Sequence, residues 1–307
     1  HGIPCHDTFG RVFAAIDPEE FGAAFLRWVG QVVPMLRREE VVAIDGKTSR
    51  RSGKAGATPL HLVSAFAAEA GVVLGQRATA AKSNEKTAIP ELLTTLALEG
   101  CIVTIDAMGT QPNIAQAIRD RGADYVLAVK DNQPTLAESI EDFVSAFDAA
   151  PERTPHRFHE VVEKDHGRLE VRRCHVFDQL DCLHAPEPWP DLKSFAMITS
   201  ERTIGGKTSV ERRFYLSSLA PDAERMNRAV RQHWRVENSL HWCMDVVFRD
   251  DQARTRTDHA AHNLAVLRQF VLNLLRTAPV KRKGGLQVQR LIAATSDSFR
   301  AQLLGLV

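Results

Sequence analysis

Val41-Val42-Ala43-Ile44-Asp45-Gly46-Lys47 is the stretch that decides the fold of this chain. Its four apolar residues run directly into an aspartate and a glycine, and a short apolar run bounded by a turn signal is typical of a strand buried on both faces. Asp45 is therefore expected at the exit of that strand. A second stretch, Cys101-Ile102-Val103-Thr104-Ile105-Asp106-Ala107-Met108-Gly109, repeats the design. Because an aspartate follows the apolar run of each strand, the two stretches predict that both aspartates belong to one site.

The composition of the 307-residue chain is that of an ordinary globular protein, with 44% hydrophobic and 25% charged residues. Its length allows one large domain or two smaller ones. No stretch approaches the roughly 20 apolar residues that a membrane span needs, and the first residues lack the pattern of a secretory signal. Five scattered cysteines favour reduced thiols in a cytoplasm over a disulfide framework.

The formal net charge of the chain is only +1, so it gives no indication of a nucleic-acid partner. Local clustering is more informative. Lys47, Arg50, Arg51 and Lys54 fill the loop just after Asp45. A solvated surface is the plain explanation of a basic run, but this run directly abuts the expected acidic site.

The order of the expected elements predicts an α/β protein with a ribonuclease H-like mixed sheet flanked by helices. Three strands in hairpin sequence are followed by helix, strand, helix and strand, at residues 41–45, 60–66, 72–78, 87–98, 101–106, 111–121 and 123–130. That order is the one of the ribonuclease H-like fold, in which the first and fourth strands are neighbours. This layout would bring Asp45 beside Asp106.

Three segments make up the expected domain organisation. They are an N-terminal helical segment, a ribonuclease H-like catalytic domain and a C-terminal helical tail, at residues 1–38, 39–275 and 276–307. The catalytic domain contains a β-rich insertion at about 150–220, placed before the last catalytic helix. Because its strands are few and the chain then returns to helix, we expect an insertion or extension and not an independent domain. A final apolar helix carries Leu264, Leu267, Phe270, Val271 and Leu274.

A long helix is predicted for residues 222–248, with a carboxylate on its apolar stripe. The apolar residues of that stripe are Met226, Val230, Leu240, Met244 and Val247. Between 230 and 240 the stripe passes through His233 and Glu237 in steps of three and four residues. A glutamate on a buried stripe needs a partner, because isolating its charge costs several kcal/mol or shifts its pKa.

Asp45, Asp106 and Glu237 form the central hypothesis, in which three acids from two strand ends and one helix face gather around divalent metal. Oxygen ligands of this type suit Mg²⁺ or Mn²⁺ better than zinc. Two carboxylates about 4 Å apart repel by roughly 4 kcal/mol at an effective dielectric near 20. Two divalent ions remove that penalty and can clamp a phosphodiester. The alternative is that both aspartates cap turns and that Glu237 pairs with a nearby arginine.

Two further patterns carry weaker indications. His233, Glu237 and His241 are spaced i, i+4, i+8, which is compatible with a transition-metal site on one helix face, although packed or solvated histidines explain the spacing more simply. Lys130-Asp131-Asn132-Gln133 follows the fifth strand, on the same sheet edge as the two aspartates. There Lys130 either meets a phosphate or merely ends the strand, with Asn132 capping the next helix.

Five stretches, taken in order, carry a resemblance to a known family. They are 41–47, Ala81-Lys82-Ser83-Asn84-Glu85-Lys86-Thr87-Ala88-Ile89-Pro90-Glu91-Leu92, 105–111, 129–133 and His233-Trp234-Arg235-Val236-Glu237-Asn238-Ser239-Leu240-His241-Trp242. Together they resemble the bacterial insertion-sequence DDE transposases, specifically the H-repeat-associated branch, over nearly the whole chain. By position, the family's catalytic acids fall on Asp45, Asp106 and Glu237.

The resemblance implies a DNA transposase with Mg²⁺ or Mn²⁺, two ions in number, that cleaves insertion-sequence ends and transfers strands into target DNA. It also implies a homodimer in a synaptic complex with transposon ends and target DNA. The basic residues expected to contact DNA are Lys47, Arg50, Arg51, Lys54, Lys130 and Arg235. His233 and Met244 stand where related transposases with a Tyr-Arg-Glu-Lys signature have arginine and lysine, so those contacts are not carried over.

Members of this branch usually carry another helical region upstream, and the chain starts at His1. We therefore expect a truncated form with weakened recognition of transposon ends. Two alternatives stay open. A nuclease on the same fold would cleave DNA without strand transfer, and an inactive remnant would bind DNA without cleaving it under any divalent metal.

Overall fold

The structure is a computed structural model that describes residues 2–33, 36–53, 58–79, 85–165, 167–279 and 283–306. The chain divides into two compact units. Unit 1 comprises His1–Leu36, Asp45–Leu96 and Arg235–Val307, and unit 2 comprises Arg37–Ile44 and Ala97–Trp234. The division passes through strand β1 (Val41–Thr48), between Ile44 and Asp45.

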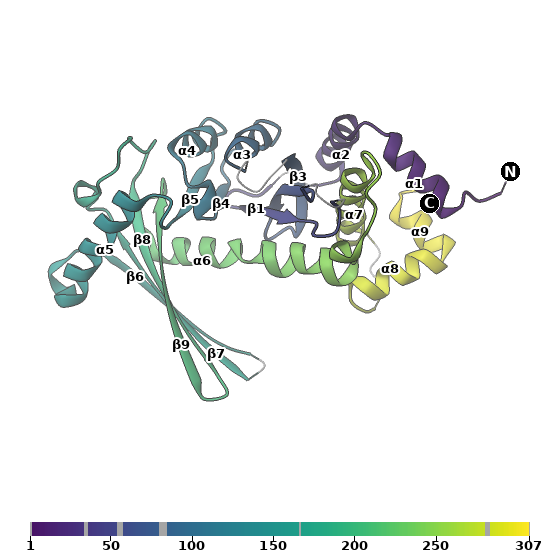
Figure 1. Cartoon of the computed structure of the whole chain (residues 1–307). Helices are drawn as coiled ribbons and strands as arrows, with labels where there is room; N and C mark the ends of the chain where they lie inside the picture. Colours follow the sequence, from purple (N-terminus) through teal and green to yellow (C-terminus); the bar gives the residue numbers. More distant parts are fainter. Residues whose placement is uncertain are drawn as a thin grey trace. The chain divides into compact units, whose positions relative to one another are not determined.

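Unit 2 is built on a sheet with the strand order β1-β4-β5-β9-β8-β7-β6. The strands after β1 are β4 (Ile102–Ile105), β5 (Asp124–Val129), β6 (Arg157–Asp165), β7 (Arg168–Phe177), β8 (Ser194–Ile204) and β9 (Lys207–Ser217). β1, β4 and β5 pair in parallel, whereas β9 pairs antiparallel with β5. β6 to β9 form long antiparallel hairpins (Figure 1). The β-rich segment thus extends the central sheet through β9.

The helices of unit 2 cover this sheet and close its core. They are α4 (Pro112–Arg119), α5 (Pro134–Ala149) and α6 (Ala223–His233), with short 3₁₀ turns η2 (Ala107–Gly109), η3 (Pro151–Arg153) and η4 (Leu180–Cys182). α6 packs on β4 to β8. Phe143 and Phe147 of α5 contact the rings of Phe177 and Phe195 from β7 and β8. All residues of β4 are buried, as expected for a parallel strand covered on both faces.

Unit 1 combines the second half of β1 with a hairpin and most of the remaining helices. Its strands β2 (His61–Ala67) and β3 (Val72–Thr79) are antiparallel, and β2 lies next to β1. Its α-helices are α1 (His6–Ala15), α2 (Pro18–Val32), α3 (Glu85–Thr94), α7 (Ala260–Thr277), α8 (Leu286–Thr295) and α9 (Asp297–Leu303). α1, α2 and β3 all pack against α7.

The strand orders β3-β2-β1 and β1-β4-β5, with β4 and β5 parallel to β1, are those of a ribonuclease H-like fold. The predicted fold class is therefore confirmed. The predicted domain limits at 38 and 275 stay a prediction. No helix in the described ranges combines the length and the hydropathy needed to cross a membrane. The five cysteines are free thiols, and the cytoplasmic location inferred from them stays a prediction.

Helix α7 buries a face that differs from the apolar stripe noted in its sequence. The five apolar residues noted in the sequence are only partly buried, whereas Asn263, Gln269 and Asn273 are at most 5% exposed. Asn263 donates to the carbonyls of residues 13 and 16. Asn273 accepts the backbone N–H of Val73 at 2.9 Å and donates to the carbonyl of Val73 at 2.7 Å. These amides join α7 to α1 and β3.

We expect Asn273→Ala to lower the free energy of unfolding by about 2 to 4 kcal/mol, because each buried backbone group left without a partner costs about 1–3 kcal/mol. Urea unfolding measures the change. The matched control is Asn113→Ala on α4, where the side chain is exposed; its effect should stay within about 0.5 kcal/mol. Equal stabilities of the two variants would contradict the prediction.

Candidate metal centre

Glu237 lies in a π-helical stretch that replaces part of the single helix expected at 222–248. After α6 the chain forms η5 (Val236–His241) and η6 (Cys243–Val247), both π-helical. The N–H of Trp242 bonds to the carbonyl of Glu237, five residues back, and Phe248 bonds to Cys243 in the same way. Short π-helical segments are rare and occur frequently at functional sites.

The expectation that Glu237 lies on a buried stripe is wrong. Its side chain is 51% exposed, and the buried residues of η5 are Val236, Leu240 and His241. Hydrogen bonds to the fifth residue widen the helical turn, so side chains no longer follow the 3.6-residue repeat on which the expectation relied. The Glu237 carboxylate is therefore partly accessible from solvent, and it also contacts the buried imidazole of His241.

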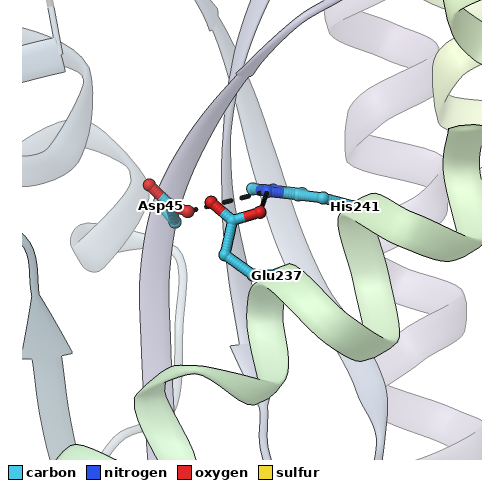
Figure 2. A group of neighbouring side chains, drawn as sticks. All are labelled: Asp45, Glu237 and His241. Atoms are coloured by element: carbon cyan, nitrogen blue, oxygen red, sulfur yellow. Dashed lines mark hydrogen bonds and ion pairs between the residues drawn. The ribbon is translucent and has the colours of Figure 1, made fainter. Parts of the chain in front are cut away.

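Asp45, Glu237 and His241 form a compact group of metal-ligating side chains in unit 1. Each offers one atom, and these atoms lie within 4.8 Å of one another. Nδ1 of His241 is 3.2 Å from Oε2 of Glu237 and 3.6 Å from Oδ2 of Asp45. Figure 2 shows the Glu237 carboxylate between the aspartate on the strand and the imidazole on the helix. Two carboxylates and an imidazole are a donor set that divalent metals accept.

A second acidic group in the described residues consists of Asp245, Asp250 and Asp251. Basic side chains form ion pairs with these carboxylates. Nζ of Lys47 is 2.7 Å from Asp245 and 3.6 Å from Asp251. Arg268 donates to Asp250 at 2.7 Å. The cations of the chain itself therefore balance this second group.

Asp45 lies inside β1, which continues to Thr48, so the expectation that it stands at the exit of the strand is wrong. In this part of β1 the chain passes a buried pair of side chains, His61 and Glu85. Oδ1 of Asp45 accepts the N–H of Gly46 at 2.8 Å. Beside Gly46, Nε2 of His61 is 2.5 Å from Oε1 of Glu85, and Nδ1 of His61 is 2.7 Å from the hydroxyl of Thr48. The side chains of His61 and Glu85 are only 3% and 4% exposed. Residues 81–84, which precede Glu85 in the family-like stretch, lie outside the described residues.

Asp106 lies in unit 2, at the exit of β4. Ile105 pairs in register with Ile44, so an aspartate directly follows each partner of this parallel pair. Oδ1 of Asp106 accepts the N–H groups of Met108 and Gly109 at 3.1 and 3.4 Å, and so caps η2. The convergence of Asp106 with the other two acids stays a prediction.

Side chains of the stretch 130–133 form hydrogen bonds with the loop that follows Asp106. The amide nitrogen of Asn132 donates to the carbonyls of Ala107 and Thr110, and Gln133 donates to the carbonyl of Thr110 at 3.0 Å. The N-cap position of α5 belongs to Gln133, so the idea that Asn132 caps this helix is wrong. Asn132 instead holds the backbone that follows a candidate ligand.

The basic residues expected to contact DNA have different surroundings. Lys47 is 15% exposed and bound to acids, as described above. Arg50 is 81% exposed, with Nε 3.4 Å from Asp251. Arg51, Lys130 and Arg235 are exposed, and Lys54 lies outside the described residues. The role of all six in DNA contact stays a prediction.

His241 is the site residue that sequence reasoning undervalued. Of the three residues spaced i, i+4, i+8, the structure brings Glu237 and His241 to Asp45, whereas Nδ1 of His233 lies 2.9 Å from the hydroxyl of Thr104. The spacing of four residues between Glu237 and His241 was the available signal. In the sequence alone, packed or solvated histidines explain that spacing more simply than a metal site does.

Arg276 of α7 forms a hydrogen bond with the backbone of the π-helical stretch. Its guanidinium donates to the carbonyl of Ser239 in η5 at 2.6 Å and to the carbonyl of Gly71. Burial lowers the pKa of Arg276 and raises the pKa of the neighbouring Cys243 thiol from their ordinary values. Arg276 is thus a hydrogen-bond donor to a carbonyl of η5. The periodicity of the sequence does not predict this contact.

The strand order, together with a group of two acids and a histidine that could hold a metal ion, is that expected of a ribonuclease H-like, metal-dependent enzyme. The family description "Transposase DDE domain" matches residues 36–274, and the chain belongs to this family. It is a DDE transposase, as the resemblance implied.

Similar proteins agree with this family. The "H repeat-associated putative transposase YhhI" of Escherichia coli K12 is 38% identical over 99% of this chain and 81% of its own length. A protein in the dhlA 3' region of Xanthobacter autotrophicus is 44% identical over 72% of this chain and 75% of its own length. Among solved structures, the piggyBac transposase synaptic complex with hairpin DNA covers 90% of this chain and 59% of its own, at 11% identity. Its TM-score of 0.39 is too low to carry an argument.

We expect Gly46→Ala to reduce both stability and metal-dependent activity. A Cβ at this position would lie 2.6 Å from Nε2 of His61 and closer still to Oε1 of Glu85, so the strand that carries Asp45 would have to move. Thermal unfolding and DNA cleavage measure the two effects. Gly30→Ala in α2, where a Cβ meets nothing within 4 Å, is the matched control and should keep both. Wild-type behaviour of Gly46→Ala would contradict the close approach.

Proposed function

We propose that the chain cleaves DNA at the ends of an insertion sequence and joins the freed ends to target DNA, with Asp45, Asp106 and Glu237 as the catalytic metal ligands. The supporting observation is the group formed by Asp45 and Glu237 with His241, residues that lie far apart in the sequence. Asp106 is assigned from its place after Ile105, the register partner of Ile44.

The donor atoms fit Mg²⁺ or Mn²⁺, and we propose that two ions bind. Carboxylate oxygens are preferred ligands of both cations, and Mn²⁺ also accepts imidazole nitrogen. The 51% exposed Glu237 leaves an approach for a ligand from solvent. When bound, the ions stabilise charge on the attacking and leaving oxygens of an in-line displacement.

The chemistry consists of two displacements at phosphorus. Water attacks the phosphodiester at the element end, and the 3′-oxygen leaves with a proton. The resulting 3′-hydroxyl attacks a target phosphodiester, and the target's 3′-oxygen leaves. The residues of the chain contribute mainly by positioning. Backbone N–H groups hold one oxygen of Asp45 and one of Asp106, which restricts the rotation of both carboxylates.

Contact with the DNA backbone is assigned to exposed basic residues near the acids. Arg50 and Arg51 follow β1, Lys130 follows β5 and Arg235 precedes Glu237. Lys54 belongs to the same basic run. Lys47 is also assigned to DNA contact. To bind a phosphate, its ammonium group would have to leave its ion pair with Asp245. Phosphate contacts of this kind give an affinity that falls as salt rises. A homodimer holding two ends in a synaptic complex is part of the proposal.

We expect Asp45→Asn, Asp106→Asn and Glu237→Gln each to reduce cleavage of an element-end DNA in Mg²⁺ by at least about 100-fold, because metal ligands contribute several kcal/mol to the transition state. Glu138→Gln on the exposed side of α5 is the control and should retain activity. Unchanged cleavage in any of the three variants would remove that residue from the site. Cleavage without joining would favour a nuclease, and binding without cleavage would favour an inactive remnant.

Divalent metal should also stabilise the protein, because it relieves repulsion among the acids. At a concentration of about 100 times Kd, a ligand bound only by the folded state adds about 2.7 kcal/mol. The melting temperature should therefore rise by several degrees in Mg²⁺ or Mn²⁺ relative to EDTA, as differential scanning calorimetry would show. Asp106→Asn should blunt the rise, and Glu138→Gln should leave it intact. An identical rise in Asp106→Asn would count against Asp106 as a ligand.

A further inference from the structure

His241 lines a cavity of about 20 Å³ inside unit 1, in addition to facing the two acids. The cavity is walled by residues of β1, β2, η5, η6, η7 (Asp250–Gln252) and α7. Most of its polar groups are already bonded. Ser49 donates to Asp250 at 2.6 Å, and the amide nitrogen of Gln269 donates to the hydroxyl of Ser64 at 3.1 Å.

Two polar atoms from this lining have no hydrogen-bond partner within the described part of the chain. They are Nε2 of His241 and Oε1 of Gln269, and both atoms are buried. The two residues are 7% and 5% exposed. A buried polar atom without a partner costs about 1–3 kcal/mol, so two such atoms from residues that line one cavity indicate a bound polar molecule.

The size of the cavity limits that molecule to water. One water needs about 10–15 Å³ of this kind of volume, and about 20 Å³ is close to that requirement. Water can also bond to both atoms, because it donates and accepts. Gln269 Oε1 can only accept, and His241 Nε2 donates or accepts according to the tautomer of the ring.

The tautomer of His241 connects this cavity with the metal centre. A histidine that binds metal through Nδ1 must carry its proton on Nε2, and the N–H of a metal-ligating histidine almost always meets a carboxylate, a carbonyl or a water. Nδ1 is the nitrogen that faces Asp45 and Glu237. Nε2 is the nitrogen that lacks a protein partner.

We propose that His241 is a further metal ligand through Nδ1, and that an enclosed water held by Gln269 accepts its Nε2–H. Gln269 is then a positioning residue, which acts on the metal only through the water and the imidazole. Ser64 in turn orients Gln269. The inference rests on the proposed function, because it requires a divalent ion between Asp45 and Glu237.

Mn²⁺ added to the full-length protein tests the inference without a catalytic assay. Electron spin echo spectroscopy should show coupling of bound Mn²⁺ to a directly ligated ¹⁴N nucleus, and His241→Ala should abolish that coupling. A titration followed by electron paramagnetic resonance should give Gln269→Met a Kd for Mn²⁺ about 10- to 100-fold higher than wild type. Gln269→Glu keeps an acceptor oxygen and should stay within a few-fold of wild type.

A matched control separates this effect from a general loss of packing. Gln302→Met on α9 makes the same chemical change away from the cavity lining and should bind Mn²⁺ as wild type does. Ser64→Ala is the second variant if Gln269→Met does not fold, and it should raise the Kd a few-fold because Gln269 loses its anchor.

The outcomes distinguish the two proposals. Absence of ¹⁴N coupling in the wild type would overturn His241 as a ligand. A wild-type Kd in Gln269→Met, or in Ser64→Ala where that variant replaces it, would overturn the water-mediated role of Gln269. If Asp45→Asn bound Mn²⁺ as tightly as wild type, the proposed metal centre itself would fail, and with it the inference.

Discussion

The parallel register of β1 and β4 is the constraint on which the candidate site depends. Ile44 pairs with Ile105, and the residues of β1 from Val41 to Ile44 are fully buried. An aspartate follows each of these two isoleucines. If the register shifted by one residue, one carboxylate would lie beside buried apolar residues. Burying an unpaired ionised group there would cost several kcal/mol of folding free energy. The hydrophobic interior therefore fixes the register of this strand pair.

Charge compensation shapes the surroundings of this part of β1. Acidic residues after η5 are balanced by Lys47, Arg50 and Arg268, so part of the basic loop serves the protein's own carboxylates. The buried pair of His61 and Glu85 occupies the space next to Gly46. Asp45 and Glu237 both lie next to the imidazole of His241.

Much of this could be predicted from the sequence, because strands buried on both faces appear as continuous apolar runs. Those runs located β1 and β4, together with the aspartates at their ends. The pairing of β9 with β5 depends on contacts distant in sequence, so the sequence left open whether the β-rich segment was an insertion or an extension. The prediction that Glu237 is buried is wrong because it relies on a 3.6-residue repeat, whereas η5 is π-helical. Arg276, from a distant helix, bonds to the π-helical carbonyl that departs from this repeat. Gln269 was overlooked for a similar reason, since its partner Ser64 lies on β2.

Within the described residues, β6 is the last strand of the extended sheet, and β7 is the one strand paired with it. Five of its nine residues are charged, and they are Arg157, Glu160, Glu163, Lys164 and Asp165. Charged side chains along an open edge discourage strand addition by another chain, which is the usual route to β-aggregation. We therefore expect this charged edge of β6 to resist pairing with a strand of another chain.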